Sequence, residues 1–153
     1  MKAVPYPAPN FALPNSEGKI ISLSDFAGKW LVVYFYPKDD TPVCTVEACS
    51  IRDAHEELKD INAHVVGISA DDSKSHQSFA ANHNLSFNLL SDENHQTIRD
   101  YGAWGKKMFG REGILRQTFI IDPNGNVVKV YGRVKSLGHG AQIVEDIKNL
   151  QKA

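Results

Sequence analysis

The stretch WLVVYFYPKDDTPVCTVEAC, residues 30–49, predicts a buried strand followed by a helix that carries both cysteines of the chain. Its first seven residues are β-branched, aromatic or aliphatic, which is typical of a strand buried on both faces. Pro37 ends this run. Thr41 is then a candidate N-cap, and Pro42 suits the first helical position, where a missing N–H is harmless. The sequence therefore predicts a strand before Pro37 and a helix from Pro42 to about residue 60.

The two cysteines lie at different positions of the predicted helix. Cys44 would lie in the first turn, where backbone N–H groups lack partners within the helix and the helix dipole favours negative charge. A thiol at such a position tends to ionise. Cys49 follows five residues later, about 140° further round the helix, and is therefore predicted to point towards solvent.

Helix geometry also limits how these cysteines can bond to each other. Ideal geometry separates their Cα atoms by about 8.6 Å, whereas a disulfide seldom tolerates more than about 6.8 Å. A bond between Cys44 and Cys49 therefore requires the first helical turns to unwind. One alternative is a pair of unrelated, buried thiols. A zinc site is not expected, because no second cysteine pair or short histidine pair completes a set of four ligands.

The apolar face of the predicted helix contains one acidic residue, Glu47. That face comprises Val43, Ile51, Ala54, Leu58 and Ile61. Cys44 lies at its edge, about 60° from its centre, and Glu47 lies near the centre. A carboxylate at such a position should be paired or protonated. We favour an ion pair that orients an arginine of the pocket; the alternative is an exposed acid that interacts with the helix dipole.

Length and composition narrow the class of protein. With 153 residues, 42% of them hydrophobic and 23% charged, the chain is expected to form one domain over residues 1–153. A net charge of −1 gives no general attraction to nucleic acid or an anionic membrane. The proline-rich start resembles no signal peptide, and no apolar run could span a bilayer. We therefore expect a cytoplasmic protein, in which two nearby cysteines are oxidised and reduced reversibly and do not form a permanent structural disulfide.

The remaining elements predict an α/β fold with one central mixed sheet flanked by helices. Strands are predicted at residues 11–13, 20–23, 30–36, 63–69, 87–90, 117–121 and 126–131, and helices at 42–60, 73–83, 92–101 and 140–151. The first two strands form an N-terminal hairpin. The sheet should be parallel in the middle, where strand, helix and strand form a βαβ unit, and antiparallel at the last hairpin, whose turn is Asp122-Pro-Asn-Gly125.

Three further predictions concern segments outside these elements. Residues 1–10 are predicted to be extended, and Ser24-Asp25 to cap a single helical turn. The segment 102–113 is predicted to be the longest irregular connection. Because the loop after strand 30–36 opens at the carboxyl edge of the sheet, we expect the functional site there.

The segment Pro37-Lys-Asp-Asp-Thr41-Pro-Val-Cys44 resembles the P-x-x-x-T-x-x-C signature of the peroxiredoxins, thiol peroxidases with a thioredoxin-like fold. The second cysteine, Cys49, is similar in its spacing to that of the Q-type subfamily, the bacterioferritin comigratory proteins. The stretches Tyr101-Gly-Ala-Trp-Gly105 and Arg116-Gln-Thr-Phe-Ile-Ile-Asp122 agree with this resemblance.

The resemblance implies a reaction and a role for each candidate residue. Cys44 would attack a peroxide and become a sulfenic acid, and Cys49 would resolve it to an intramolecular disulfide. The Thr41 hydroxyl would bond to the thiolate and the peroxide, and Arg116 would stabilise negative charge. Pro37 would shield the thiol from water. No cofactor is implied.

Alternative roles remain open for two of these residues. Thr41 could be a plain N-cap that accepts a bond from the Cys44 N–H. Arg116 could be a solvated residue at the start of a strand, with Arg133 or Arg111 in its place.

Three functions are compatible with these residues. The first is a peroxidase for hydrogen peroxide and organic hydroperoxides, recycled by thioredoxin or glutaredoxin and acting as a monomer. The second is a disulfide oxidoreductase, which normally needs a C-x-x-C motif. The third is a peroxide sensor or redox-regulated holdase. We favour the peroxidase.

Overall fold

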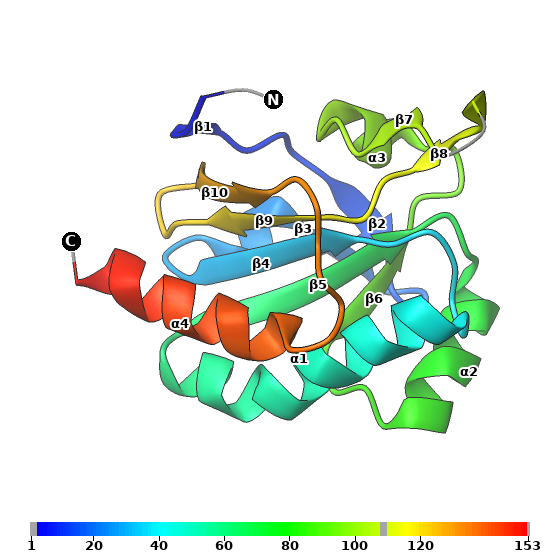
Figure 1. The fold of residues 1–153 in the computed structure, drawn as a ribbon, viewed down its shortest axis with the longest axis horizontal. Helices are drawn as coiled ribbons and strands as arrows, with labels where there is room; N and C mark the ends of the chain where they lie inside the picture. The colour runs from blue at the N-terminus through cyan, green and yellow to red at the C-terminus, as the bar shows by residue number, and fades with distance from the viewer. Residues whose placement is uncertain (1–2, 108–109, 153) are drawn as a thin grey trace.

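The computed structural model describes residues 3–107 and 110–152 (Figure 1). The main sheet of this described part consists of β1 (Tyr6–Pro7), β4 (Trp30–Phe35), β5 (Ala63–Ser69), β6 (Asn88–Ser91), β9 (Gln117–Ile121) and β10 (Asn126–Tyr131). The helices are α1 (Pro42–Asp60), α2 (Ser73–His83), α3 (Gln96–Asp100) and α4 (His139–Gln151), with a 3₁₀ turn η1 (Leu23–Phe26). Two small hairpins pair β2 (Ala12–Pro14) with β3 (Ile20–Ser22) and β7 (Trp104–Lys106) with β8 (Glu112–Ile114).

The main sheet is mixed, as the sequence predicts. Its order is β1-β10-β9-β4-β5-β6. The strands β4, β5 and β6 are parallel to one another, and β9 pairs with β4 in the antiparallel direction. The prediction of an α/β fold with a central mixed sheet and an N-terminal hairpin is therefore confirmed.

Alternate residues of β4 supply the two hydrophobic cores. Val32 and Tyr34 lie in the core under α1 and α4, whereas Val33 and Phe35 lie in the core on the opposite face. This alternation follows from the two-residue period of a strand. It explains why the whole run is apolar: both faces of β4 are covered.

The helices α1 and α4 lie side by side on one face of the sheet (Figure 1). They lie so close at Gly140 that any side chain there would collide with the backbone carbonyl of Ser50. The Gly140 N–H also donates to Ser50 Oγ at 2.9 Å. The opposite face is covered by α3 and by the segments that include Phe11 and Ile21.

The lead-in at residues 1–10 includes the extended strand β1, in agreement with the prediction, and this strand pairs with β10 at the edge of the sheet. Two other predicted segments were wrong in part. The segment 102–113 contains β7 and β8 rather than irregular structure throughout; residues 108–109 lie outside the described part. The helix predicted over 92–101 begins only at Gln96. His95 adopts a left-handed conformation (φ 64°), which a continuous right-handed helix cannot include.

The apolar face of α1 is rotated relative to the prediction. Val43 was predicted to face the core, but its side chain is 53% exposed. Cys44 was predicted at the edge of that face and is only 1% exposed. The buried stripe follows positions 44, 48, 51, 55 and 58 at helical spacing, so Val43 lies one residue, or about 100°, away from it.

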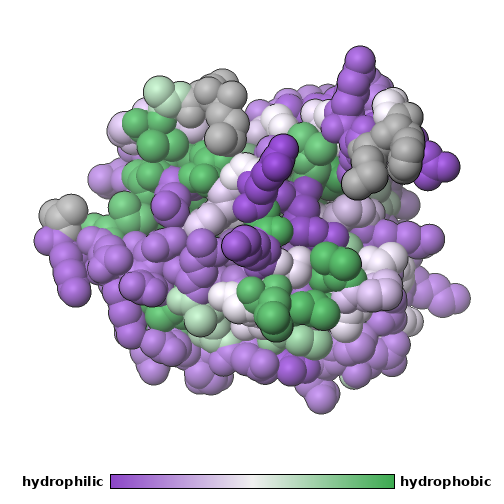
Figure 2. Space-filling model, in the orientation of Figure 1, coloured by the Kyte–Doolittle hydropathy of each residue, from purple (hydrophilic) through white to green (hydrophobic). Residues whose placement is uncertain are grey.

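The face of the molecule in Figure 2 is mainly hydrophilic, with apolar residues exposed over the N-terminal part of α1. These include Val43 and Val46. Within the described ranges, no helix has the length and apolar character needed to cross a membrane.

Candidate active site

The candidate site lies where β4 ends and α1 begins. Thr41 is the N-cap residue of α1, with an extended backbone (φ −81°, ψ 153°), and Pro42 is the first helical residue. Cys44 is therefore in the first turn, as predicted, and its free thiol is buried. This position directs a nucleophilic side chain to the carboxyl edge of the parallel strands, where sites of open α/β sheets form.

The side chain of Arg116 contacts the thiol of Cys44. It lies between β8 and β9, and Gln117 of β9 pairs with Phe35 at the end of β4. The antiparallel pairing therefore brings Arg116 beside the start of α1. Its Nη2 donates to Cys44 Sγ at 3.2 Å, and its Nη1 donates to Glu47 Oε1 at 2.7 Å. One guanidinium thus holds both the sulfur and the carboxylate of the first turns.

Glu47 is completely buried, which confirms its predicted position on the core face of the helix. It forms the favoured ion pair with Arg116 through Oε1, while Oε2 has no hydrogen-bond partner among the described residues. Burial raises the pKa of Glu47 from 4.5 to about 7, and the charge and hydrogen bond of Arg116 act against that rise.

The pKa of Arg116 responds to the same contacts. Its partial burial lowers the pKa, but the bonds to Cys44 and Glu47 outweigh this and raise it. Arg116 therefore remains a cation.

The raised pKa of Glu47 predicts a pH-dependent loss of stability. Between pH 4.5 and about 7 the folded protein holds a proton on Glu47 that the unfolded chain has already released. The free energy of unfolding should therefore fall as pH rises through this window, by up to about 3 kcal/mol. Glu47→Gln does not titrate and still offers Arg116 an oxygen, so it should lose less stability over the same window.

Urea unfolding of both proteins at a series of pH values measures this difference. Glu57→Gln is the matched control, because Glu57 is an exposed carboxylate paired with Lys148; it should follow the pH dependence of the wild type. A constant difference between wild type and Glu47→Gln at all pH values would contradict the prediction.

A cavity of about 490 Å³ opens beside Arg116. Its lining residues are Pro37, Lys107, Leu115, Arg116, Gly132, Arg133 and Val134. The structure thus brings Pro37 and Arg116 together, and it places Arg133 in the wall of the same cavity. Arg111, the other alternative cation, is exposed.

Lys107 is a cation of this cavity that the sequence did not indicate. Burial and the charge of Arg116 lower its pKa, and Cys44 partly offsets this. The cavity is therefore cationic, and it is far larger than a molecule of water, which occupies about 30 Å³.

Thr41 does not form the expected capping bond. Its hydroxyl donates to the Lys38 carbonyl at 2.9 Å, and no side-chain bond from Thr41 caps α1. Asp40 adopts a positive φ of 60°, so the chain turns back and brings that carbonyl within reach. The alternative of a plain N-cap to the Cys44 N–H was therefore wrong. The oxygen of the hydroxyl can still accept a bond.

Cys49 lies further along the uninterrupted helix α1, and its thiol is free and partly exposed. A straight helix holds the Cα atoms of the two cysteines about 8.6 Å apart, which is too far for a disulfide. The structure therefore brings Cys44, Glu47 and Arg116 together, and it leaves Cys49 apart from them.

The sequence also did not indicate a buried polar network beside the site. His76 is completely buried and bonds to Asp39. Asp39, Asp71 and His76 offer atoms within 4.8 Å of one another, a spacing that could hold a metal ion. Each of them is already hydrogen-bonded within the protein, so we assign no metal to this cluster.

The chain is similar to known proteins over most of its length. The model of the AhpC/TSA family matches residues 4–130. A putative peroxiredoxin bcp of Coxiella burnetii is 47% identical over 140 residues, which cover 90% of this chain and 93% of the relative. Peroxiredoxin Bcp of Bacillus subtilis is 41% identical over 148 residues, with 95% and 94% covered.

A solved structure shows that this similarity extends to the fold. The bacterioferritin comigratory protein of Xanthomonas campestris, studied for its alkyl peroxide reduction activity, superposes with a TM-score of 0.86 at 36% identity. The superposition covers 91% of this chain and 90% of the other.

Proposed function

This chain belongs to the AhpC/TSA family of peroxiredoxins, and we propose that it reduces hydrogen peroxide and organic hydroperoxides through Cys44. The observation that carries the proposal is the Arg116 guanidinium, which bonds the Cys44 sulfur and lines a cavity of about 490 Å³. A cation beside a buried sulfur stabilises a thiolate, and its remaining N–H groups can bind an oxygen of the substrate.

In the first step, the Cys44 thiolate attacks one oxygen of the peroxide. An S–O bond forms while the O–O bond breaks, and the leaving oxygen takes a proton to depart as water or an alcohol. Sulfur is oxidised to a sulfenic acid and the peroxide is reduced. Complete ionisation of a thiol gains only about 30-fold in rate at neutral pH. Most of the acceleration must therefore come from donors that align the peroxide and stabilise the leaving oxygen, and we assign this role to Arg116 and Thr41.

Glu47 and Pro37 support this step without reacting. Glu47 fixes the guanidinium through its 2.7 Å bond, so that the second nitrogen points at the sulfur. Pro37 lies in the wall of the cavity, and we assign to it the role of shielding the thiol from water.

In the second step, the Cys49 thiolate attacks the sulfenic sulfur of Cys44. The S–S bond forms, and hydroxide leaves and is protonated to water. Because an intact α1 holds the two cysteines too far apart, its first turns must unwind. Thioredoxin or glutaredoxin would then reduce the disulfide by thiol exchange. The exposed Val43 and Val46 offer apolar contact surface to such a reductant. An internal disulfide needs no second subunit, so we propose a monomer that works in a reducing compartment such as the cytoplasm.

Stopped-flow mixing of the reduced protein with hydrogen peroxide and with cumene hydroperoxide tests the function. We expect Cys44 to react at least about 10³-fold faster than free cysteine. Rates equal to those of free cysteine would end the proposal.

Cys49→Ser separates the two steps. The variant should react with the first equivalent of peroxide at the wild-type rate, because Cys49 lies on a different face of α1 from Cys44 and Cys44 keeps its bond to Arg116. Its steady-state turnover with NADPH, thioredoxin reductase and thioredoxin should fall at least about tenfold, since no internal disulfide forms. Mass spectrometry after one equivalent of peroxide should show a disulfide in the wild type and a sulfenic acid in the variant. Normal turnover of Cys49→Ser would show that another thiol resolves Cys44.

A further inference from the structure

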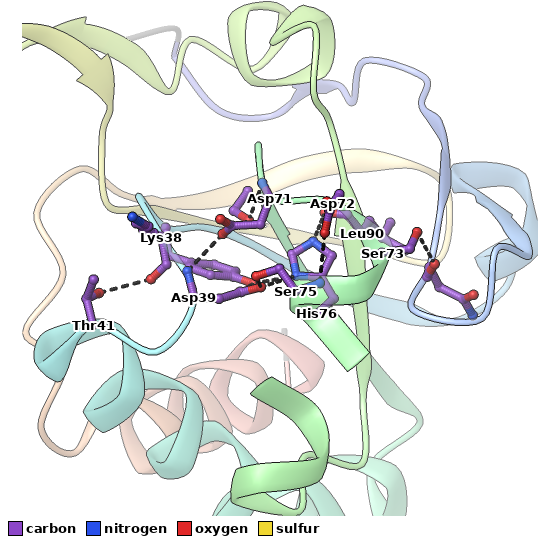
Figure 3. A network of polar contacts seen from close by, with 12 residues as sticks. Lys38, Asp39, Thr41, Asp71, Asp72, Ser73, Ser75, His76 and Leu90 are labelled. Carbon is purple, nitrogen blue, oxygen red and sulfur yellow. Dashed lines mark hydrogen bonds and ion pairs between the residues drawn. The ribbon is translucent and has the colours of Figure 1, made fainter. Parts of the chain in front are cut away.

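A network of buried polar side chains holds the segment between β4 and α1, residues 37–41 (Figure 3). Its centre is the carboxylate of Asp39, which is 4% exposed. One oxygen of Asp39 accepts from the Tyr36 hydroxyl at 2.6 Å. The other accepts from Ser75 Oγ at 2.8 Å and lies 2.7 Å from Nδ1 of His76.

The backbone of Asp39 is fixed as well as its side chain. Its N–H donates to Asp71 Oδ2 at 2.8 Å, and Ser69 Oγ donates to the same oxygen at 2.7 Å. Asp39 is therefore attached to the end of β5, to the loop that follows it and to α2. The strand β5 and the helix α2 are regular elements, whereas residues 37–41 form a connection without regular structure.

The bonds of His76 show that it and Asp39 act as a pair. The Nε2 atom of His76 lies 3.0 Å from the Leu90 carbonyl, which can only accept, so Nε2 carries a hydrogen. Nδ1 faces a carboxylate oxygen, which also accepts. One proton must therefore lie between Nδ1 and Asp39, and loss of either side chain leaves the other buried without its partner.

The segment needs such an anchor. Asp40 adopts a left-handed conformation (φ 60°), which is disfavoured for a residue with a Cβ and persists only where neighbours fix it. The Asp40 side chain pairs with His83, but this pair is half-exposed and contributes little. Thr41 and the first residue of α1 follow directly. The Asp39–His76 pair is buried on both sides, and it therefore fixes residues 37–41 more firmly than the half-exposed Asp40–His83 pair does.

We propose that Asp39 and His76 are positioning residues that hold residues 37–41 and the first turn of α1 in the geometry that reacts with peroxide. This inference rests on the proposed peroxidase function. Neither residue contacts Cys44; they act through the backbone that places Thr41 and Cys44. Breaking the contact between Asp39 and His76 favours the state in which the first turns of α1 are unwound and Cys44 reaches Cys49. The pair therefore has opposite effects on the two steps: it accelerates the attack on peroxide and restrains formation of the disulfide.

Asp39→Ala tests this proposal, because it removes the carboxylate and leaves the backbone N–H in place. The rate of the reaction between reduced Cys44 and hydrogen peroxide should fall about tenfold or more. The rate of disulfide formation from the sulfenic acid should stay the same or rise. Amide exchange of residues 42–49 in the reduced protein should become faster. Asp39→Asn should restore all three values to within about twofold, because its amide accepts from Tyr36 and donates to a neutral His76.

A matched control excludes a general loss of stability. His55 is a buried histidine further along α1 that bonds to Ser86 Oγ at 2.6 Å. It lies eleven residues after Cys44, or about 16 Å along the helix. His55→Ala should lower the melting temperature and leave both rates unchanged. If Asp39→Ala does not fold, His76→Gln is measured in its place and should show the same changes. The side-chain amide of glutamine cannot bond the Leu90 carbonyl and the Asp39 carboxylate at the same time.

The outcomes separate this proposal from the proposed function. If the wild type reacts with peroxide no faster than free cysteine, the proposed function is wrong. Amide exchange of residues 42–49, compared between wild type and Asp39→Ala, still shows whether the Asp39–His76 pair holds α1. A fast wild type together with an equally fast Asp39→Ala, whose exchange is unchanged, overturns the positioning role.

Discussion

Cys44→Ser is expected to abolish peroxidase turnover, with a loss of at least about 10³-fold. A serine hydroxyl stays protonated at neutral pH, so it offers no anion to attack the O–O bond, and Arg116 has no thiolate to stabilise. Serine is slightly smaller than cysteine and should fit the buried first turn of α1. The ion pair between Arg116 and Glu47 does not involve the sulfur and should remain.

The measurement is peroxide consumption with thioredoxin and its reductase in excess. Cys49→Ser, assayed with stoichiometric peroxide, is the matched control, since it removes the other thiol of the same helix and should retain the first oxidation. Circular dichroism should show that both variants fold. Turnover of Cys44→Ser above about one per cent of the wild-type value would show that the reaction does not depend on this sulfur.

Arg116→Gln is expected to slow the reaction of Cys44 with peroxide by about 10²- to 10³-fold, the usual cost of removing one preorganised donor from a developing oxyanion. Glutamine retains a polar N–H, but it has no charge and cannot bond Cys44 and Glu47 with two nitrogens of one plane. The variant also removes the cation that opposes the raised pKa of Glu47. The pKa of Glu47 should therefore rise further, and the carboxyl should be neutral at pH 7.

Arg133→Gln is the matched control, because Arg133 lines the same cavity, whereas Arg116 alone of the two bonds the sulfur. Its second-order rate constant should change by less than about threefold. Rate constants from stopped-flow experiments at several pH values test both variants. Equal losses in the two variants would mean that the cavity needs positive charge in general and that no single guanidinium aligns the peroxide.

Local sequence patterns were sufficient to predict the fold and the positions of Cys44 and Glu47 in the first turns of α1. The apolar run before Pro37 and the cap residues at Thr41 and Pro42 predicted β4 and α1, and the thioredoxin-like α/β fold is confirmed by the similarity to solved structures. The helical wheel placed Glu47 on the buried face, where a carboxylate should be paired or protonated, and an ion pair with an arginine of the pocket was favoured. The structure forms that pair with Arg116, the arginine that the family resemblance indicated.

Contacts between distant segments could not be predicted in this way. Asp39 and His76 are separated by 37 residues, and the periodicity of α2 gives no sign that one of its histidines meets a carboxylate. The bond of Thr41 to Lys38 depends on the left-handed backbone of Asp40, which the sequence does not reveal. The rotation of α1 depends on how it packs against the sheet and α4, and therefore the exposure of Val43 was predicted wrongly.

In the proposed formation of the Cys44–Cys49 disulfide, the contact between Gly140 and Ser50 limits the distance that the sulfur of Cys44 must travel. The Gly140 N–H of α4 donates to the side chain of Ser50, which directly follows Cys49. In the proposed step, Cys49 would therefore stay in place while Cys44, five residues before it, moves. A chain anchored so close explores a small volume, and the two sulfurs meet at a high effective concentration however dilute the protein is. This arrangement depends on a residue with no side chain, since any larger residue at position 140 would push Ser50 away.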